Sequence, residues 1–168
     1  MSFDERIREI TSLAEGMRLN VLIWGPGPAA TEHYAKREKI RQQIKQTFIN
    51  ADVRFSEDLE HKIPGSKDLS LPEQELLHLA ACDICIILDV SKGAGEEIAH
   101  FISSGYSHKL VILTHEKYKV ATSFPAALRK YENQLFFNDD EYEHCHLVDR
   151  VLARTRLLAI GKLGRLFL

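Results

Sequence analysis

The sequence predicts one α/β domain over residues 1–168, built as a three-layer, doubly wound sheet of five parallel strands in the flavodoxin-like order 2-1-3-4-5. Two observations predict this fold. Short apolar runs alternate with helical patterns from one end of the chain to the other. Strands that are separated by helices require right-handed crossovers, which place helices on both faces of a parallel sheet. The 168 residues and 45% hydrophobic content suit a single core.

The first third of the chain contains two predicted helices and two predicted strands. Apolar residues recur at helical spacing over residues 4–16, and Gly16 closes that pattern. Residues 19–24 form a short apolar run that stops abruptly at Gly-Pro-Gly-Pro, as a buried strand would. A helix over residues 31–49 and a short strand over residues 52–56 complete this part.

The rest of the chain continues the alternation after an irregular stretch at residues 57–72. Proline suits the first turn of a helix, so Leu71-Pro72-Glu73 predicts a helix start there. The expected elements are a helix ending at 81, a strand at 83–89, a helix at 95–104, a strand at 109–114, a helix at 124–131, a strand at 134–137 and a last helix at 139–159.

The predicted strand order brings two unusual loops together. In this order the topological switch point lies between the first and third strands, and ligands of such sheets bind there, beyond the carboxyl ends of the strands. The loop after the first strand is Gly25–Pro28, and the loop after the third contains residues 91–97. We therefore expect the two loops to form the walls of one crevice.

The first loop supplies four candidate substrate-binding residues, Trp24, Gly25, Pro26 and Gly27. Glycine permits close approach of a ligand to the backbone, and the helix that follows presents free amide groups. The loop matches neither a Walker motif nor a G-x-G-x-x-G fingerprint. A rigid turn between strand and helix is the alternative interpretation.

The second loop supplies the candidate catalytic residues. Glu97 is predicted in the first turn of a helix, where the helix dipole favours the ionised carboxylate, and such a carboxylate can attack or stabilise an anomeric carbon. Asp89 ends the preceding strand and could orient a sugar hydroxyl. Ser91, Gly93 and Ala94 are candidate substrate-binding residues. The alternative is that the glutamate is an ordinary helix-start acid.

The composition of the chain limits the kinds of molecule that we expect it to bind. A formal charge of −2 gives no strong nucleic-acid signal, and no apolar run approaches the roughly 20 residues of a membrane span. The odd count of three cysteines predicts a reduced, cytoplasmic protein. We expect no metal or other cofactor, because Cys82 and Cys85 have Cys-x-x-Cys spacing but point to opposite faces of a predicted strand, and the histidines are scattered. An apolar tail at residues 157–168 is expected to cover the core or to pack on a second subunit.

Several motifs recur together in one family. A strand ends in Gly25-Pro26, an Asp-led apolar strand covers residues 83–89, and Gly93 precedes Glu97-Ile98-Ala99. In these features the chain resembles the nucleoside 2-deoxyribosyltransferase-like family, which is flavodoxin-like and related at fold level to NAD-cleaving domains of TIR type. The resemblance covers residues 19–114. It implies that Glu97 displaces a nucleobase from C1′, and that a neighbouring subunit completes the site in a homo-oligomer.

One departure from that family leaves two functions open. Base-transferring members commonly carry an acid six positions before the nucleophile, and here Ser91 occupies that position. The expected function is therefore an enzyme that transfers a base or hydrolyses an N-glycosidic bond of a nucleoside, nucleotide or NAD-type substrate. The alternative is a non-catalytic nucleotide-binding sensor or adaptor. A phospho-acceptor receiver domain fits less well, because no acidic pair follows the first strand.

Overall fold

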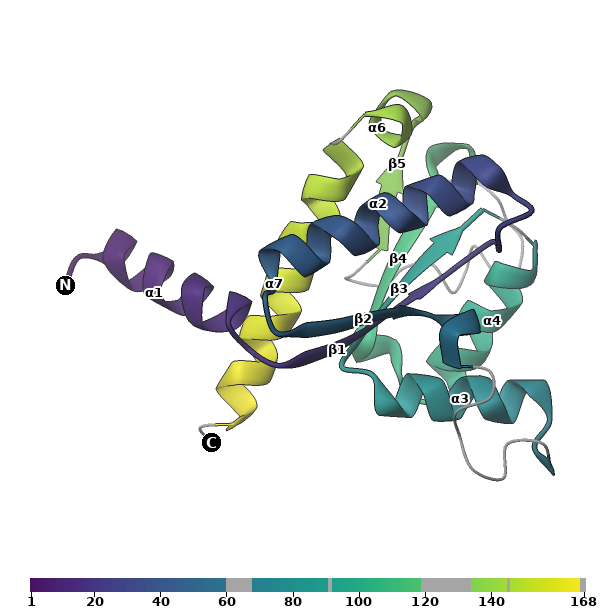
Figure 1. Cartoon of the computed structure of the whole chain (residues 1–168), viewed down its shortest axis with the longest axis horizontal. Coiled ribbons are helices and arrows are strands. Elements are labelled where there is room, and N and C mark those ends of the chain that lie inside the picture. The colour runs from purple at the N-terminus through teal and green to yellow at the C-terminus, as the bar shows by residue number, and fades with distance from the viewer. Residues whose placement is uncertain (60–67, 91, 119–133, 145, 167–168) are drawn as a thin grey trace.

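The computed structural model describes residues 1–59, 68–90, 92–118, 134–144 and 146–166, and it confirms the predicted sheet (Figure 1). Five parallel strands are arranged in the order β2-β1-β3-β4-β5. Their bounds are β1 Leu19–Trp24, β2 Ala51–Phe55, β3 Ile84–Asp89, β4 Leu110–His115 and β5 Gln134–Phe137.

Helices cover both faces of the sheet. The longer helices are α1 Phe3–Glu15, α2 Thr31–Thr47, α3 Leu71–Ala81, α4 Lys92–Ser103, α6 Asp139–Glu143 and α7 His146–Leu166. Short 3-10 turns are η1 Ser56–Leu59, η3 Ser107–Lys109 and η4 Glu116–Tyr118. Helices α2 and α7 pack on one face, and α3 and α4 pack on the other (Figure 1).

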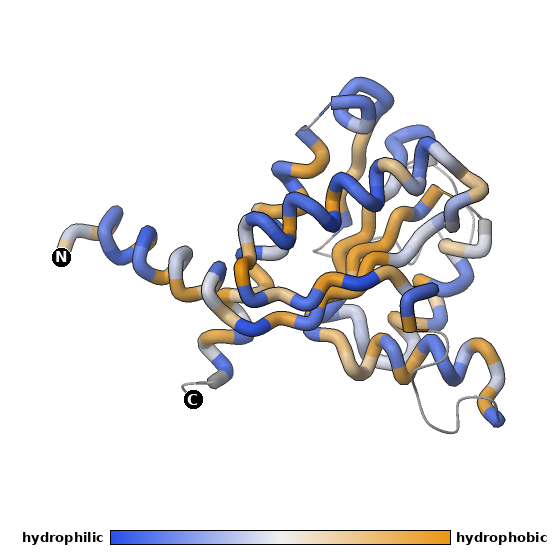
Figure 2. The backbone as a smooth tube through the Cα atoms, in the orientation of Figure 1, coloured by the Kyte–Doolittle hydropathy of each residue, from blue (hydrophilic) through white to orange (hydrophobic). Residues whose placement is uncertain are grey.

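The alternation of side chains along the strands builds two separate cores, because successive residues of a strand point to opposite faces. Val21 and Ile23 of β1 join the core under α2 and α7. Leu22 and Trp24 join the core under α3 and α4. Hydrophobic residues are accordingly concentrated along the strands (Figure 2), and those of the helices pack against them in the two cores.

The carboxyl-terminal helix differs from its prediction. The expected continuous helix over 139–159 is divided into α6 and α7. Asn138 caps α6 with a capping box, and α6 ends at Glu143, where His144 takes an extended conformation. The predicted helix at 124–131 lies outside the described residues.

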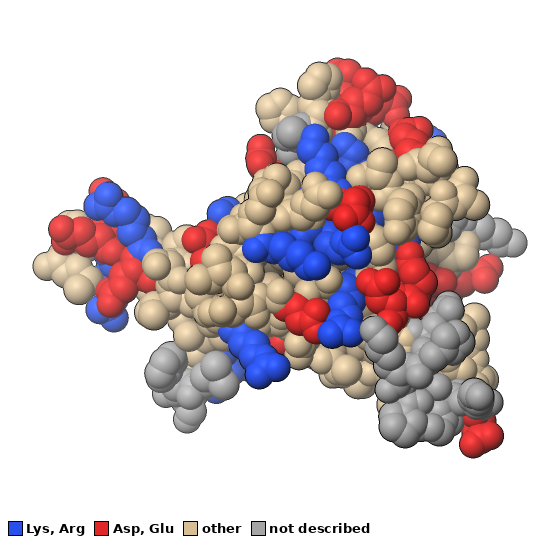
Figure 3. Space-filling model, viewed as in Figure 1, with Lys and Arg blue, Asp and Glu red and all other residues tan. Residues whose placement is uncertain are grey.

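Helix α1 projects from the body of the molecule (Figure 1). Its carboxyl end is anchored, because Ala14 is buried and Glu15 forms an ion pair with Arg156 of α7. Along the face seen in Figure 3, basic side chains form a ridge over α2 with acidic side chains beside it. Within the described part of the chain, no helix combines the length and apolar character needed to cross a bilayer.

Candidate functional site

A cavity of about 280 Å³ opens at the carboxyl edge of the sheet, beside the end of β1. Three segments line it: the end of β1 with the loop that follows, the start of η1, and one side of α3. The lining residues are Trp24, Gly25, Gly27, Pro28, Ser56, Glu57, Leu71, Gln74, Glu75 and His78. Ligands of doubly wound sheets bind at this edge. The wall that faces the β1 loop is formed by α3 and η1, whereas the sequence predicted a wall from residues 91–97.

Gly25 is required by the geometry of the first wall. Its backbone φ of 151° lies in a region that residues other than glycine rarely adopt. A Cβ atom added there would lie 2.9 Å from Cβ of Leu88 and 3.3 Å from Cδ of Arg37. The loop therefore turns closely over β3 and α2, which places Trp24 and Gly27 at the cavity.

Arg37 of α2 fixes this loop through hydrogen bonds to its backbone. Its side chain is fully buried, and its guanidinium donates hydrogen bonds to the carbonyl oxygens of Pro26 at 2.8 Å and Ile23 at 2.9 Å. It also binds both carboxylate oxygens of Glu57, at 2.9 and 2.8 Å, and lies 4.3 Å above the ring of Phe55. Arginine is seldom fully buried unless its guanidinium is paired. Here its bonds connect the loop after β1 with Glu57 of η1, and in this way Arg37 holds two parts of the cavity wall together. Sequence reasoning missed it, since one basic residue among the five on α2 carries no signal.

Glu57 is the acidic member of that pair. Burial favours its neutral form, but hydrogen bonds from Arg37 and Ser56 outweigh the effect, so its pKa is lowered. The positive charge of Arg37 is consequently neutralised inside the wall and is not offered to the cavity.

Helix α3 presents a polar stripe to the cavity. Leu71, Gln74, Glu75 and His78 follow the i, i+3, i+4, i+7 spacing of one helix face. Burial raises the pKa of Glu75, while His100 on α4 opposes that effect. The spacing can be read from the sequence, but only the tertiary structure shows that these four side chains line a cavity.

Glu97 lies on α4 and is not among the described residues that line the cavity. Burial of its half-buried carboxylate and the nearby charge of Glu75 raise its pKa to about 7. The indole N–H of Trp24 acts in the opposite direction and lowers this pKa. Glu97 is thus electrostatically coupled to two residues of the cavity lining.

This environment corrects one sequence expectation. Helix α4 begins at Lys92 rather than at residue 95, and its first turn contains no acid. Glu97 therefore lies in the second turn, beyond the range in which the helix dipole acts strongly. Desolvation dominates, and the carboxylate is held near the balance between its two protonation states instead of being kept ionised.

Asp89 is buried at the end of β3, with 2% of its surface exposed. Its Oδ2 accepts a hydrogen bond of 2.9 Å from the hydroxyl of Thr114, the residue opposite it on β4. That hydroxyl in turn accepts a hydrogen bond of 3.1 Å from Gln134 of β5. Asp89 is therefore linked through Thr114, near the carboxyl end of β4, to Gln134, the first residue of β5.

Of the other predicted site residues, three lie outside the cavity lining and one is not described by the structure. Pro26 contributes its carbonyl oxygen to Arg37 rather than its ring to the cavity. Gly93 is exposed and Ala94 is buried, both in the first turn of α4, and neither lines the cavity. Ser91 lies outside the described residues.

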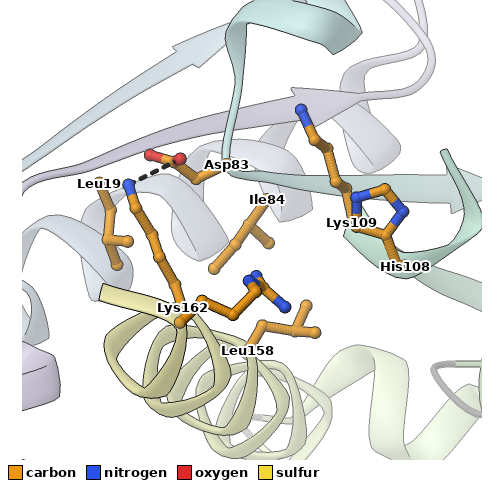
Figure 4. Close-up of a pocket in the computed structure, with 8 residues that line it drawn as sticks. Leu19, Asp83, Ile84, His108, Lys109, Leu158 and Lys162 are labelled. Carbon is orange, nitrogen blue, oxygen red and sulfur yellow. Dashed lines mark ion pairs between the residues drawn. The ribbon is translucent and has the colours of Figure 1, made fainter. Parts of the chain in front are cut away.

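A second cavity, of about 210 Å³, lies at the opposite edge of the sheet between β1, β3, η3 and α7 (Figure 4). Two of its basic side chains, Lys109 and Lys162, have partners among the described residues. Lys162 forms an ion pair of 2.7 Å with Asp83, and the Lys109 ammonium donates to three carbonyl oxygens around the end of α3. These contacts join α7 and α3 to the sheet, so we assign this cavity a structural role.

Comparison with known protein families and with curated proteins finds no match to this chain. Among the described residues, no three histidine, cysteine or acidic side chains come together as a metal site would require.

Proposed function

We propose that this protein cleaves or transfers the N-glycosidic bond of a nucleoside-type substrate, with Glu97 as nucleophile. The observation that carries the proposal is the electrostatic coupling of Glu97 to two residues that line the cavity, Trp24 and Glu75. A half-buried carboxylate with a pKa of about 7 is available in both protonation states near neutral pH.

The reaction would follow the chemistry of retaining glycosidases. The C1′–N bond breaks, and its electron pair leaves with the base. An ionised oxygen of Glu97 captures C1′ as an ester. Water, or the nitrogen of a second base, then displaces the carboxylate and loses one proton. Hydrolysis and base transfer differ only in this last acceptor.

Other residues would have supporting roles. Glu75 lines the cavity and shares the desolvated environment of Glu97, so it suits proton transfer to the leaving base. Trp24 would position the Glu97 carboxylate, and Arg37 would hold the loop that forms the floor. Asp89 would act as a positioning residue, because its carboxylate is bonded to Thr114.

The direct test is base release from a panel of nucleosides, nucleotides and NAD, resolved by chromatography. We expect Glu97→Gln to reduce release at least a hundredfold while the far-ultraviolet spectrum stays unchanged. Glu96→Gln is the matched control, since Glu96 is exposed on the same helix, and it should retain activity. Release by Glu97→Gln at the parental rate would reject the proposed function.

The alternative, a non-catalytic nucleotide sensor, makes a different prediction in the same assay. Nucleotides would raise the melting temperature, while no free base would accumulate in the parent protein or in either variant. Turnover that depends on Glu97 would exclude this alternative.

A further inference from the structure

We infer that Cys82 and Cys85 form a peroxide-sensitive thiol pair, in which oxidation of the folded protein joins the two sulfur atoms in a disulfide. This inference is separate from the proposed function, because neither cysteine lines the cavity at the carboxyl edge. It depends on where the two thiols lie and on another cavity that gives access to one of them.

The structure places both thiols on the same face of the sheet. The sequence predicted opposite faces, because it placed Cys82 and Cys85 on one strand. That expectation is wrong: α3 ends at Ala81 and β3 begins at Ile84, so Cys82 lies in the connection between them. Both cysteine side chains belong to the core under α3 and α4.

The two thiols also interact. Burial raises the pKa of the Cys85 thiol well above its ordinary value, and the neighbouring Cys82 thiol raises it further. The Cys82 thiol donates a hydrogen bond of 3.3 Å to the carbonyl oxygen of Leu79, in the last turn of α3. Both thiols are free, and disulfide formation requires such neighbouring sulfur atoms.

A third cavity gives access to Cys82. Its volume is about 210 Å³, and it lies between β1, β2, η1 and α3. Cys82 lines this cavity and is 6% exposed, whereas Cys85 is not among the described lining residues and is fully buried. One water molecule needs only roughly 10–15 Å³ of such space, so hydrogen peroxide can enter. Oxidation therefore begins at Cys82, because reactivity follows access.

The reaction needs a peroxide as its only co-reactant. The sulfur of Cys82 attacks one peroxide oxygen, the O–O bond breaks, and the departing hydroxide takes up the thiol proton to form water. The sulfur of Cys85 then displaces hydroxide from the resulting sulfenic acid, and its own proton leaves with that hydroxide as a second water molecule. Two electrons pass from the two thiols to the peroxide, which is reduced to water.

The test treats the folded, full-length protein with hydrogen peroxide, blocks the remaining thiols under denaturing conditions and analyses tryptic peptides by mass spectrometry. Peptide 68–92 contains Cys82 and Cys85 and no other cysteine. We expect this peptide to be unblocked and lighter by two hydrogen atoms, and to accept two blocking groups after reduction with dithiothreitol. In the unoxidised protein, Cys82 should be alkylated roughly tenfold faster than Cys85, because only Cys82 lines a cavity.

Three variants assign the two roles. Cys85→Ser should stop at the sulfenic acid of Cys82, which dimedone traps. Cys82→Ser should leave Cys85 unmodified by peroxide. Cys145→Ser is the control and should form the disulfide as the parent does, since the third cysteine takes no part in the pair.

Two results would overturn the inference. One is a peptide 68–92 whose two thiols can both still be blocked after peroxide treatment of the folded protein. The other is a disulfide that requires Cys145 or that forms only in urea. The parent protein alone decides between these outcomes, even where a cysteine variant fails to fold. Base release plays no part in the measurement, so failure of the proposed function would leave this result unaffected.

Discussion

The indole N–H of Trp24, the last residue of β1, acts on the carboxylate of Glu97 in the second turn of α4 and favours its ionised form. Burial and the charge of Glu75 favour the neutral form and outweigh the indole, so the pKa is raised to about 7. Because Trp24 lines the cavity, we expect a ligand that displaced the indole to raise the pKa of Glu97 further.

Replacing Trp24 with Phe should raise the pKa of Glu97 further. The change removes the donor but keeps an aromatic ring, and a hydrogen bond of about 1 kcal/mol corresponds to a shift of roughly one pH unit. The charged groups that act on Glu97, Glu75 on α3 and Glu96 on α4, remain in place. Titration of the glutamate side-chain carbons by NMR, together with the pH dependence of base release, measures the shift. An unchanged midpoint in both would contradict the role given to the indole.

Replacing Glu97 with Gln should stabilise the protein at alkaline pH. The pKa of this carboxyl rises from 4.5 in the unfolded chain to about 7 in the folded protein, so folding favours its protonated form. That stabilising contribution is present below pH 4.5 and is lost as the pH rises through 7. After allowance for solvent screening, we expect Glu97→Gln to gain about 1–2 kcal/mol at pH 8 and almost nothing at pH 5.

Urea denaturation at the two pH values measures this difference. Glu96→Gln, on the exposed side of the same helix, should show a much smaller pH dependence. If Glu97→Gln were less stable than the parent at pH 8, the carboxylate would have to be stabilised by its surroundings, contrary to our account.

Replacing Gly25 with Ala should destabilise the fold by about 2–4 kcal/mol, through backbone strain and overpacking. The positive φ excludes a side chain, and the new Cβ would lie 2.9 Å from Leu88. Gly27 is the matched control, because a Cβ atom there would meet nothing within 4 Å. Thermal or urea denaturation of the two variants should separate them clearly, and equal losses would argue against the close packing of the loop.

Replacing Arg37 with Met should cost about 3–5 kcal/mol, since the change leaves Glu57 without its cationic partner and two carbonyl oxygens without donors. Arg54→Ala is the control, because Arg54 forms an exposed ion pair with Asp52 whose loss should cost less than about 1 kcal/mol. Urea denaturation compares the two. A similar small cost for both would mean that the buried arginine does not organise the wall.

Replacing Thr114 with Val should destabilise the protein by about 1–3 kcal/mol, because the buried Asp89 carboxylate loses a hydrogen bond that valine cannot supply. If Asp89 acts only as a positioning residue, the variant should keep the KM for its substrate within about threefold where it remains folded. A large rise in KM with unchanged stability would instead indicate that Asp89 contacts the substrate.

The fold was predictable because the signals that encode it are local. The apolar runs of β1, β3 and β4 are short and bounded by turn residues, so each could be recognised from its own segment of sequence. The right-handed crossover rule then leaves few arrangements for strands that alternate with helices. The presence of a cavity at the carboxyl edge agrees with the rule for doubly wound sheets.

The sequence by itself determined which segments become strands and helices, and that the loop after β1 lies at the ligand-binding edge. Only the tertiary structure decided that α3 forms the facing wall, that Arg37 is buried beneath Pro26, and that Glu97 has a pKa near neutrality. The reason is physical. Secondary structure depends on the periodicity of neighbouring residues, whereas burial, ion pairing and desolvation depend on side chains that are distant in sequence and meet only after packing.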